Sequence, residues 1–119
     1  MTEPLDPLSL LTLARKLGSE RDEASLRTAV NRAYYALFLV AREKTYVVQT
    51  ERAHSEVVTR IRNRSGGAQI AFWLRELFML RNVADYELLP EDPTQRDWVA
   101  NSRRALLLAD RLLPRLQAL

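Results

Sequence analysis

Apolar residues recur at helical spacing along this chain, most clearly in the stretch from Arg27 to Ala41. At about 100° per residue, one side of this stretch carries Leu26, Val30, Ala33, Tyr34, Leu37 and Ala41. Leu39 falls on the opposite side, with Arg32 and Tyr35 close to it. The pattern predicts a central helix that is covered on two sides, either by four neighbouring helices or by a second copy of the chain.

Residues that favour helix ends divide the chain before and within this region. Asp6, which precedes a proline, is typical of a helix start, and Gly18 is typical of a helix end. These residues predict a first helix over residues 7–18. Ser19 and Asp22 resemble a capping box, which predicts that the central helix runs over residues 20–44.

Two further helices are expected in the middle of the chain. Thr50 can cap a third helix, whose apolar face carries His54, Val57, Val58 and Ile61. His54 is therefore expected to point inward. From Ala68 a fourth helix is expected, and within about 40° of one line it carries Ile70, Leu74, Leu77, Arg81 and Leu88. Arg81 lies in the middle of this apolar stripe, so its charge must be paired or must line a cleft.

A fifth helix is predicted to start at Asp92, which again precedes a proline. Its inner face carries Trp98, Ala105, Ala109, Leu112 and Leu116, and Leu107 points the other way. Pro114 is expected to kink or fray the last turn. The chain is thus predicted to be all-α, an antiparallel bundle of four to five helices in a single domain over residues 1–119.

Composition narrows the class of protein. The 119 residues suffice for one core, cysteine is absent, and no segment is apolar for long enough to span a membrane. The first six residues do not resemble a signal peptide, and together these features favour a soluble, cytoplasmic protein. The net charge is only +3, but sixteen of the eighteen basic residues are arginine, which weakly favours an anionic partner.

Two groups of arginines have both a structural and a functional interpretation. Arg60, Arg62 and Arg64 follow the third apolar face, where they either complement a helix dipole or contact phosphate. Arg104, Arg111 and Arg115 align on the fifth helix, with Leu108 interrupting them. They form either a solvated basic face or a surface for nucleic acid or an acidic partner.

Two motifs together resemble the HEPN superfamily. The first is the stretch Asn31-Arg32-Ala33-Tyr34-Tyr35-Ala36-Leu37-Phe38. It is followed by the helix that contains His54 and then by Leu80-Arg81-Asn82-Val83-Ala84-Asp85-Tyr86. The chain is similar to the branch with an Arg-Ala-Tyr-Tyr helix followed by an Arg-x-x-Ala-Asp-Tyr helix, over residues 20–115.

The resemblance implies a helical bundle that dimerises and belongs to a prokaryotic toxin–antitoxin, defence or RNA-processing system. Many such proteins act beside a nucleotidyltransferase. Active HEPN ribonucleases need no metal and carry an arginine, a polar residue, a short spacer and a histidine in a cleft between two copies. Arg81 and Asn82 match the first two positions, but Tyr86 stands where the shortest spacing would place the histidine.

The missing histidine leaves several roles open for the site residues. Cleavage through the ribose 2′-hydroxyl needs a group that exchanges a proton near neutral pH, which a phenol does poorly. Arg81 and Asn82, with Tyr86, are therefore either catalytic or contact RNA without cleaving it. Alternatively, Arg81 pairs with Asp85 one helical turn away and is structural.

The remaining candidates also have two interpretations each. His54 is either a hydrogen-bonded core residue or a base that replaces the missing imidazole. Arg32 and Tyr35 either contact a partner copy or line the cleft. Asp85 is a third candidate for lining the cleft or binding RNA. No cofactor is expected, and one histidine without cysteine makes a metal site improbable.

Two classes of function follow from these alternatives. The first is a HEPN-type RNA-associated protein, a toxin–antitoxin or defence component that acts with a nucleotidyltransferase and has weak or absent ribonuclease activity. The second is a non-catalytic helical dimer that binds protein or nucleotide as a regulatory module.

Overall fold

The fold is entirely helical, as the pattern of apolar positions predicts. The computed structural model describes residues 4–119. Its helices are α1 (Pro7–Gly18), α2 (Glu23–Thr45), α3 (Ala53–Arg62), α4 (Ala68–Tyr86) and α5 (Trp98–Gln117), with a short 3-10 helix, η1 (Pro93–Gln95), before α5. No strand occurs among these residues.

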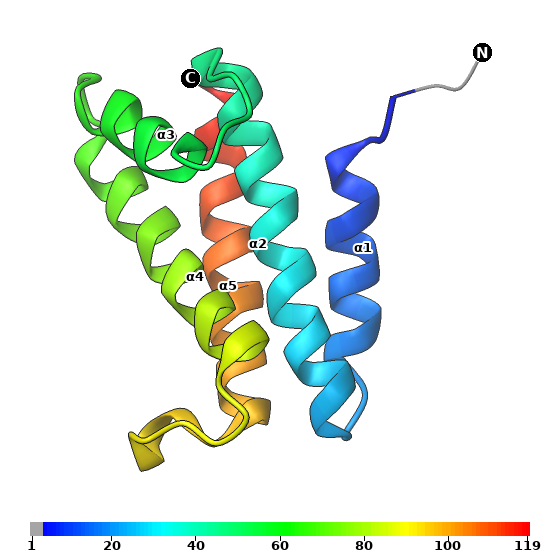
Figure 1. The fold of residues 1–119 in the computed structure, drawn as a ribbon. Helices are drawn as coiled ribbons and strands as arrows, with labels where there is room; N and C mark the ends of the chain where they lie inside the picture. The colour runs from blue at the N-terminus through cyan, green and yellow to red at the C-terminus, as the bar shows by residue number, and fades with distance from the viewer. Residues whose placement is uncertain (1–3) are drawn as a thin grey trace.

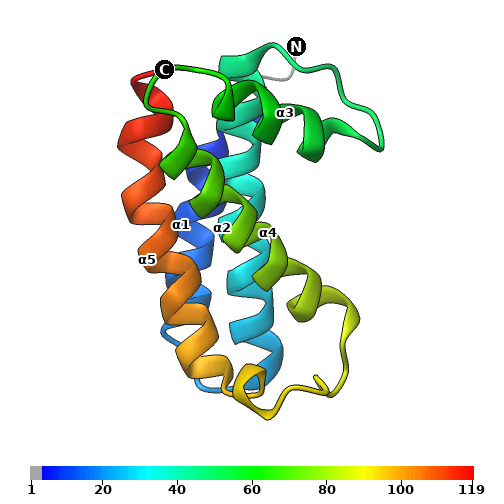
Figure 2. The same cartoon turned by 90° about the vertical axis from the view of Figure 1, so that its left-hand side faces the viewer.

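The long helices alternate in direction. α1, α2, α4 and α5 run along the bundle, and α3 lies across one end of it (Figure 1). The start of α1 and the end of α5 lie at the end that α3 crosses, whereas η1 lies at the opposite end (Figure 2). The predicted antiparallel bundle is therefore present, with four long helices and one short crossing helix.

The central position of α2 resolves the first question that the sequence raises. α2 packs against each of the other four helices, as the first of the two explanations for its two-sided apolar pattern predicts. Leu39, on the side opposite the main stripe, borders a groove with Leu5 and Pro7 beside α1. Buried apolar side chains from all five helices form one continuous core, whose largest fully buried members include Tyr34, Leu37, Ile61, Leu74, Leu77, Leu108 and Leu112.

The start of α2 differs from the prediction by three residues. Asp22 alone caps the helix, because its carboxylate accepts a hydrogen bond from the Ser25 backbone N–H at 2.9 Å. Ser19 instead belongs to the end of α1, where its hydroxyl donates to the Lys16 carbonyl. Residues 20–22 thus connect two helices and are not the first turn of α2. The first helix itself has the predicted bounds.

The start of α3 also lies later than predicted. Thr50 accepts a hydrogen bond from the Arg52 N–H through its hydroxyl oxygen, but the helix begins at Ala53. The arginines at the other end of α3 reach a neighbouring helix. Arg60 donates to the Thr45 carbonyl at 2.7 Å and Arg64 to the Lys44 carbonyl at 3.1 Å. They therefore complement the carboxyl end of α2, where carbonyl groups lack helical partners.

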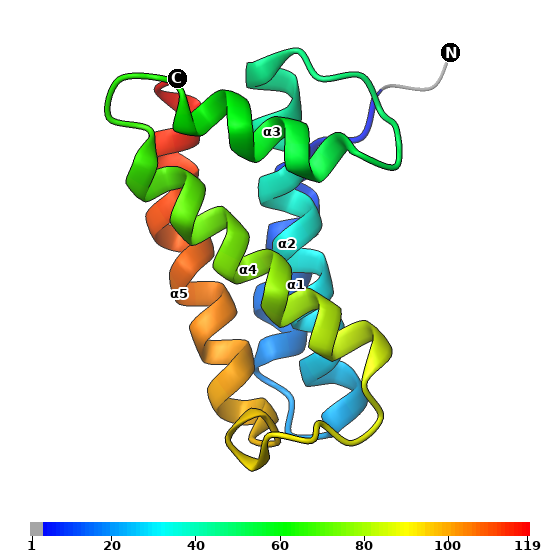
Figure 3. The ribbon, with the colours of Figure 1, turned by 60° about the vertical axis from the view of Figure 1, so that its left-hand side comes forward.

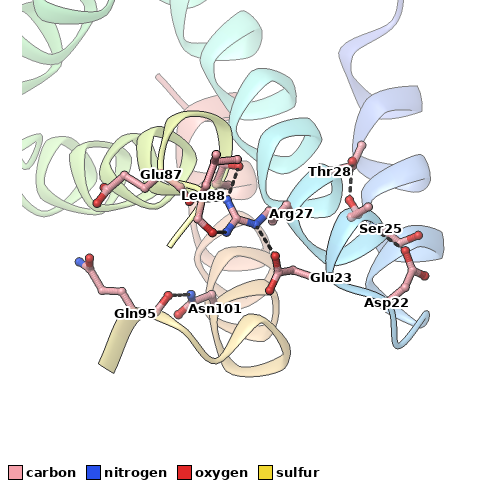
Figure 4. A network of polar contacts seen from close by, with 11 residues as sticks. Asp22, Glu23, Ser25, Arg27, Thr28, Glu87, Leu88, Gln95 and Asn101 are labelled. Atoms are coloured by element: carbon pink, nitrogen blue, oxygen red, sulfur yellow. Dashed lines mark hydrogen bonds and ion pairs between the residues drawn. The ribbon is translucent and has the colours of Figure 1, made fainter. Parts of the chain in front are cut away.

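The end of α4 is set by a contact from α2. The Arg27 guanidinium donates to the backbone carbonyls of Ala84, Glu87 and Leu88 and pairs with Glu23 (Figure 4). α4 stops at Tyr86, so the prediction that Leu88 continues the apolar stripe is wrong. The Leu88 side chain is 94% exposed.

The fifth helix begins five residues later than predicted. The turn after Asp92 is only the short helix η1, and Asp97 caps α5 by accepting from the Ala100 N–H at 3.0 Å. Pro114 lies inside α5, which continues to Gln117. The predicted inner face is buried, and Leu107 is exposed as expected.

The arginines of α5 do not form one solvated face. Arg104 donates to both carboxylate oxygens of Glu76 on α4, each at 2.9 Å. The Arg115 guanidinium lies 4.9 Å from the centroid of the Trp73 ring, also on α4. Among the described residues, Arg111 is the one of the three arginines that is exposed and makes no such contact. Leu108, between them, is buried in the core.

Within residues 4–119, no helix combines enough residues with enough apolar character to cross a membrane.

Candidate functional site

The Arg81 guanidinium lies among aromatic rings between α2 and α4. Its central carbon is 5.1 Å from the Tyr34 ring centroid, 5.4 Å from that of Tyr35, 5.2 Å from that of Phe78 and 5.8 Å from that of Tyr86. These distances are within the range of cation–π attraction. The Arg81 side chain is 12% exposed, so the charge predicted in the apolar stripe is held in a pocket of aromatic rings.

An acidic partner and an amide complete the surroundings of Arg81. Asp85, one turn later on α4, lies with its carboxylate 3.5 Å from Arg81 Nη1. Asn31 on α2 donates to both oxygens of that carboxylate, at 2.9 and 3.1 Å. The predicted pairing of Arg81 with Asp85 is therefore present, and Asn31 joins it to the central helix.

Arg81 is not fully satisfied by these contacts. Its Nε is buried and is the one buried side-chain nitrogen or oxygen without a hydrogen-bond partner among the described residues. Its Nη1 is 3.5 Å from the Tyr86 hydroxyl, at the limit of hydrogen bonding. The guanidinium thus retains donor capacity for a further group.

His54 points inward, as its place on the apolar face of α3 predicts. Its ring stacks on Phe78 of α4 with the centroids 3.6 Å apart. Its Nδ1 lies 2.9 Å from the Tyr34 hydroxyl. A hydrogen bond from that hydroxyl to Nδ1 suits a neutral imidazole whose other nitrogen carries the proton.

Burial and nearby charge act together on these titratable groups. Burial, with the positive charges of Arg81 and Arg75, lowers the pKa of His54 from 6.5 to about 4. Burial also raises the pKa of the Tyr34 phenol, although Arg81 opposes this change. Burial disfavours the charged form of Arg81, but Tyr35, Tyr34 and Asp85 outweigh it and raise the guanidinium pKa. At neutral pH the site therefore carries a neutral imidazole beside a permanent cation.

A hollow of about 300 Å³ opens beside these groups, and we call it the Arg81 hollow. Its lining residues come from α2, from the start of α3 and from α4. Figure 3 shows how α3 crosses beside α2 and α4. Arg81, His54, Tyr34 and Tyr35 line it, together with Gln49 and Thr50 from the connection between α2 and α3. The lining also includes one acidic residue, the exposed Glu51, so a cation, aromatic rings, neutral polar groups and one carboxylate surround the space.

The other candidate residues lie around this hollow or away from it. Tyr86 is 74% exposed at the end of α4 and approaches Arg81 only through its hydroxyl. Asn82 and Arg32 are half-buried, and neither lines the Arg81 hollow. Their side chains make no hydrogen bond or ion pair with any described residue. The structure thus brings together Arg81, Asp85, Tyr35, Tyr86 and His54, but not Asn82 or Arg32.

Residues missing from the sequence-based candidates also form the site. Tyr34 and Phe78 look like ordinary core positions in the sequence, because both follow the helical period. Asn31 is part of the first motif, and its spacing of four residues from Tyr35 would have placed it on the same face of α2. No cluster of three or more His, Cys, Asp or Glu side chains suited to a metal occurs in residues 4–119.

The chemistry of this arrangement favours recognition of an anion or a planar group. A guanidinium offers donors to phosphate or carboxylate, and aromatic rings can stack on a base. The neutral His54, with its low pKa and its hydroxyl partner, is a weak proton acceptor at neutral pH. Comparison of the chain with protein-family models, curated proteins and solved structures found no match.

Proposed function

We propose that this chain is a HEPN-type RNA-associated protein, a component of a toxin–antitoxin or defence system that acts with a nucleotidyltransferase. We further propose that the Arg81 hollow binds RNA with weak or absent ribonuclease activity. The observation that carries the proposal is the Arg81 guanidinium, enclosed by aromatic rings and bordering an open hollow beside His54. A positive charge next to aromatic faces is the combination that single-stranded nucleic acid requires.

The balance between binding and cleavage follows from the two groups that could move a proton. Tyr86 occupies the position of the motif histidine, and a phenol with an ordinary pKa near 10 is a poor base at neutral pH. His54 has the right ring, but its pKa of about 4 makes it a weak base. Its Nδ1 also faces the Tyr34 hydroxyl. These features support RNA binding with slow cleavage or none.

The direct test measures binding and cleavage on the same protein. Fluorescence anisotropy with labelled single-stranded RNA should show saturable binding, and Arg81→Gln should weaken it at least ten-fold. Arg103→Gln, an exposed position on α5 outside the hollow, is the control with the same change in charge. Cleavage of mixed RNA in chelator should be slow or absent. Failure of the wild type to bind RNA would overturn the proposal. An equal loss of RNA affinity in Arg103→Gln and Arg81→Gln would also overturn it.

The proposed system has its own test in cells. Expression of the chain alone should arrest growth if it acts as a toxin, and co-expression of the proposed nucleotidyltransferase partner should relieve the arrest. Arg81→Gln should abolish the arrest while the protein still accumulates. Normal growth on wild-type expression, or arrest that the partner leaves unchanged, would contradict a toxin–antitoxin role.

A second candidate function, a non-catalytic helical dimer, is supported by one face of α4. Phe72, Met79 and Tyr86 follow each other at intervals of seven residues and are 64%, 55% and 74% exposed. We propose that this row contacts a second copy of the chain, because a seven-residue apolar repeat suits helix pairing. Sedimentation should show a dimer at micromolar concentration that Met79→Glu dissociates. A wild-type monomer would contradict the dimer.

A further inference from the structure

A second hollow adjoins the Arg81 hollow on the outer side of α3 and α4. It has a volume of about 270 Å³, and we call it the Arg75 hollow. The two hollows share His54, Ser55 and Phe78 in their linings, so they meet across the stacked rings of His54 and Phe78. Arg75 and Arg62 line the second hollow. The surface therefore presents guanidinium groups on both sides of one aromatic pair.

The Arg75 hollow carries positive charge without a compensating acid. Its lining includes no aspartate or glutamate. Neither Arg62 nor Arg75 makes a side-chain hydrogen bond or an ion pair within residues 4–119, and both are exposed. Other arginines of the same region are engaged, since Arg60 and Arg64 donate to carbonyl groups of α2. Folding therefore leaves these two guanidinium groups free to bind an external anion.

Positive charges from both hollows act on the His54 imidazole. After burial, the charges of Arg81 and then Arg75 contribute most to lowering the pKa of its imidazole. Each charge acts from its own hollow, and both stay close enough to affect the same ring. A ligand that neutralises either charge therefore also changes the field at His54.

We propose that Arg62 and Arg75 form a second phosphate subsite, which binds the backbone of a single-stranded RNA beyond the nucleotide held at Arg81. This inference rests on the proposed RNA binding and assigns it two further residues. Phosphates spaced along a strand pair with successive guanidinium groups, as in grooves that track a nucleic-acid backbone. Phe78 and the exposed Met79 supply apolar surface between the charges.

A single strand suits this surface better than an acidic peptide or a duplex. Each hollow is small, and the half-buried aromatic pair that both share offers apolar contact to a base but no partner to a carboxylate. A duplex keeps its bases paired inside the helix, so it cannot use the rings. An acidic peptide could still pair with the arginines, so it is included as a competitor in the test.

The test uses salt dependence, which reports how many phosphates a protein contacts. Binding of a labelled oligouridylate is measured by anisotropy at several salt concentrations for the wild type and for Arg62→Gln/Arg75→Gln. The matched control is Arg103→Gln/Arg111→Gln, which removes the same charge from exposed positions of α5 that line neither hollow. Losing two contacts should weaken binding about ten-fold and lower the slope of log affinity against log salt by about 1.4.

A mononucleotide separates the two subsites. Uridine monophosphate has one phosphate, so its binding should depend on Arg81 and change less than two-fold in Arg62→Gln/Arg75→Gln. Melting temperatures of both double variants should match the wild type, because all four residues are exposed.

The outcomes distinguish this inference from the proposed function. If the wild type and Arg62→Gln/Arg75→Gln bind oligouridylate with equal affinity and slope while Arg81→Gln fails to bind, the second subsite is wrong and RNA binding stands. If no form binds RNA, the proposed function fails first. If a polyglutamate peptide displaces the RNA and its own binding needs Arg62 and Arg75, the surface is a protein-binding site and the inference is overturned.

Discussion

Asn31 on α2 donates hydrogen bonds to both carboxylate oxygens of Asp85 on α4, and Asp85 in turn pairs with Arg81. The contact joins residues 54 positions apart in the chain. It connects the two helices that carry the two sequence motifs. Asn31 thus holds the carboxylate that neutralises Arg81, and it positions the guanidinium without contacting it.

Replacing Asn31 with alanine should therefore destabilise the bundle and loosen Arg81. Loss of two bonds to a partly buried carboxylate costs about 1–2 kcal/mol. Urea denaturation should report this decrease in the free energy of unfolding. Asn63→Ala is the control, because Asn63 is exposed and its side chain makes no hydrogen bond among the described residues; its effect should stay within about 0.5 kcal/mol. Equal losses in both variants would contradict the role given to Asn31.

The low pKa of His54 predicts a dependence of stability on pH. The folded-state pKa is about 4 and the unfolded value is 6.5, so the unfolded chain binds more protons between these values. The contribution of His54 is therefore complete above pH 6.5 and is lost as the pH falls toward 4. Between pH 7 and pH 5 the free energy of unfolding should decrease by up to about 2 kcal/mol.

His54→Gln isolates this effect, because glutamine does not titrate. The difference in unfolding free energy between wild type and variant should shrink as the pH falls from 7 to 5. Titration of the imidazole followed by NMR should give a midpoint well below 6.5. A midpoint at or above 6.5 would show that the ring is neither buried nor close to Arg81 and Arg75.

Arg27 is expected to hold the end of α4 in place. Besides its three carbonyl contacts, its guanidinium lies 4.2 Å from the Trp98 ring centroid on α5. Arg27→Ala should cost about 2–3 kcal/mol, since it leaves these carbonyls without a donor. Hydrogen exchange should accelerate in residues 84–97 more than in α1. Arg103→Ala should leave exchange in that segment unchanged, and an equal change would exclude a specific role for Arg27.

Alanine substitutions at the neighbouring positions Gly66 and Gly67 should differ in how much they destabilise the fold. A Cβ at Gly67 would lie 1.8 Å from the Ile61 carbonyl oxygen, so Gly67→Ala forces the backbone between α3 and α4 to move. Gly66 has φ +72° and nothing within 4 Å of such a Cβ. Gly66→Ala should cost only about 1 kcal/mol for its left-handed backbone, and Gly67→Ala should cost more than 2 kcal/mol. Thermal melts compare them directly, and the reverse order would contradict this contact.

Local signals in the sequence predict where most helices lie. Asp6 and Gly18 bound the first helix as expected, and Asp6 caps it by accepting a hydrogen bond from the Leu8 N–H. Gly18 has no positive φ, and a Cβ there would lie 2.7 Å from the Leu106 side chain of α5. The start of α2 was placed too early because Ser19 and Asp22 both suit caps. Only the hydrogen bond from Ser25 to Asp22 decides between them.

The errors at α4 and α5 have a different cause. The apolar period in the sequence predicts a helix that continues through Leu88. In the structure, Arg27 binds the carbonyl groups that would otherwise accept hydrogen bonds from the next helical turn. The turn at Asp92 begins with the expected cap, and then Asp97 starts a new helix. The contact at the end of α4 comes from a distant segment, which the local pattern does not contain, whereas the start of α5 depends on which of two local caps, Asp92 or Asp97, begins the long helix.

The candidate site was partly predictable. The spacing of Arg81 and Asp85 on one helix predicts their pairing, and the apolar stripe predicts that Arg81 is enclosed. The aromatic rings around it were missed, because Tyr34 and Phe78 fit the core pattern as well as they fit a site. Their convergence on one guanidinium requires the packing of α2 against α4.

The packing of α2 against every other helix has a consequence for how the domain folds. A fragment that lacks this helix keeps mainly the contacts of α4 with α3 and α5 and of α1 with α5, and α2 without its neighbours exposes apolar surface on several sides. Partly assembled forms therefore gain little stability from buried apolar surface. The bundle should lose its structure in one all-or-none step when heated or titrated with denaturant.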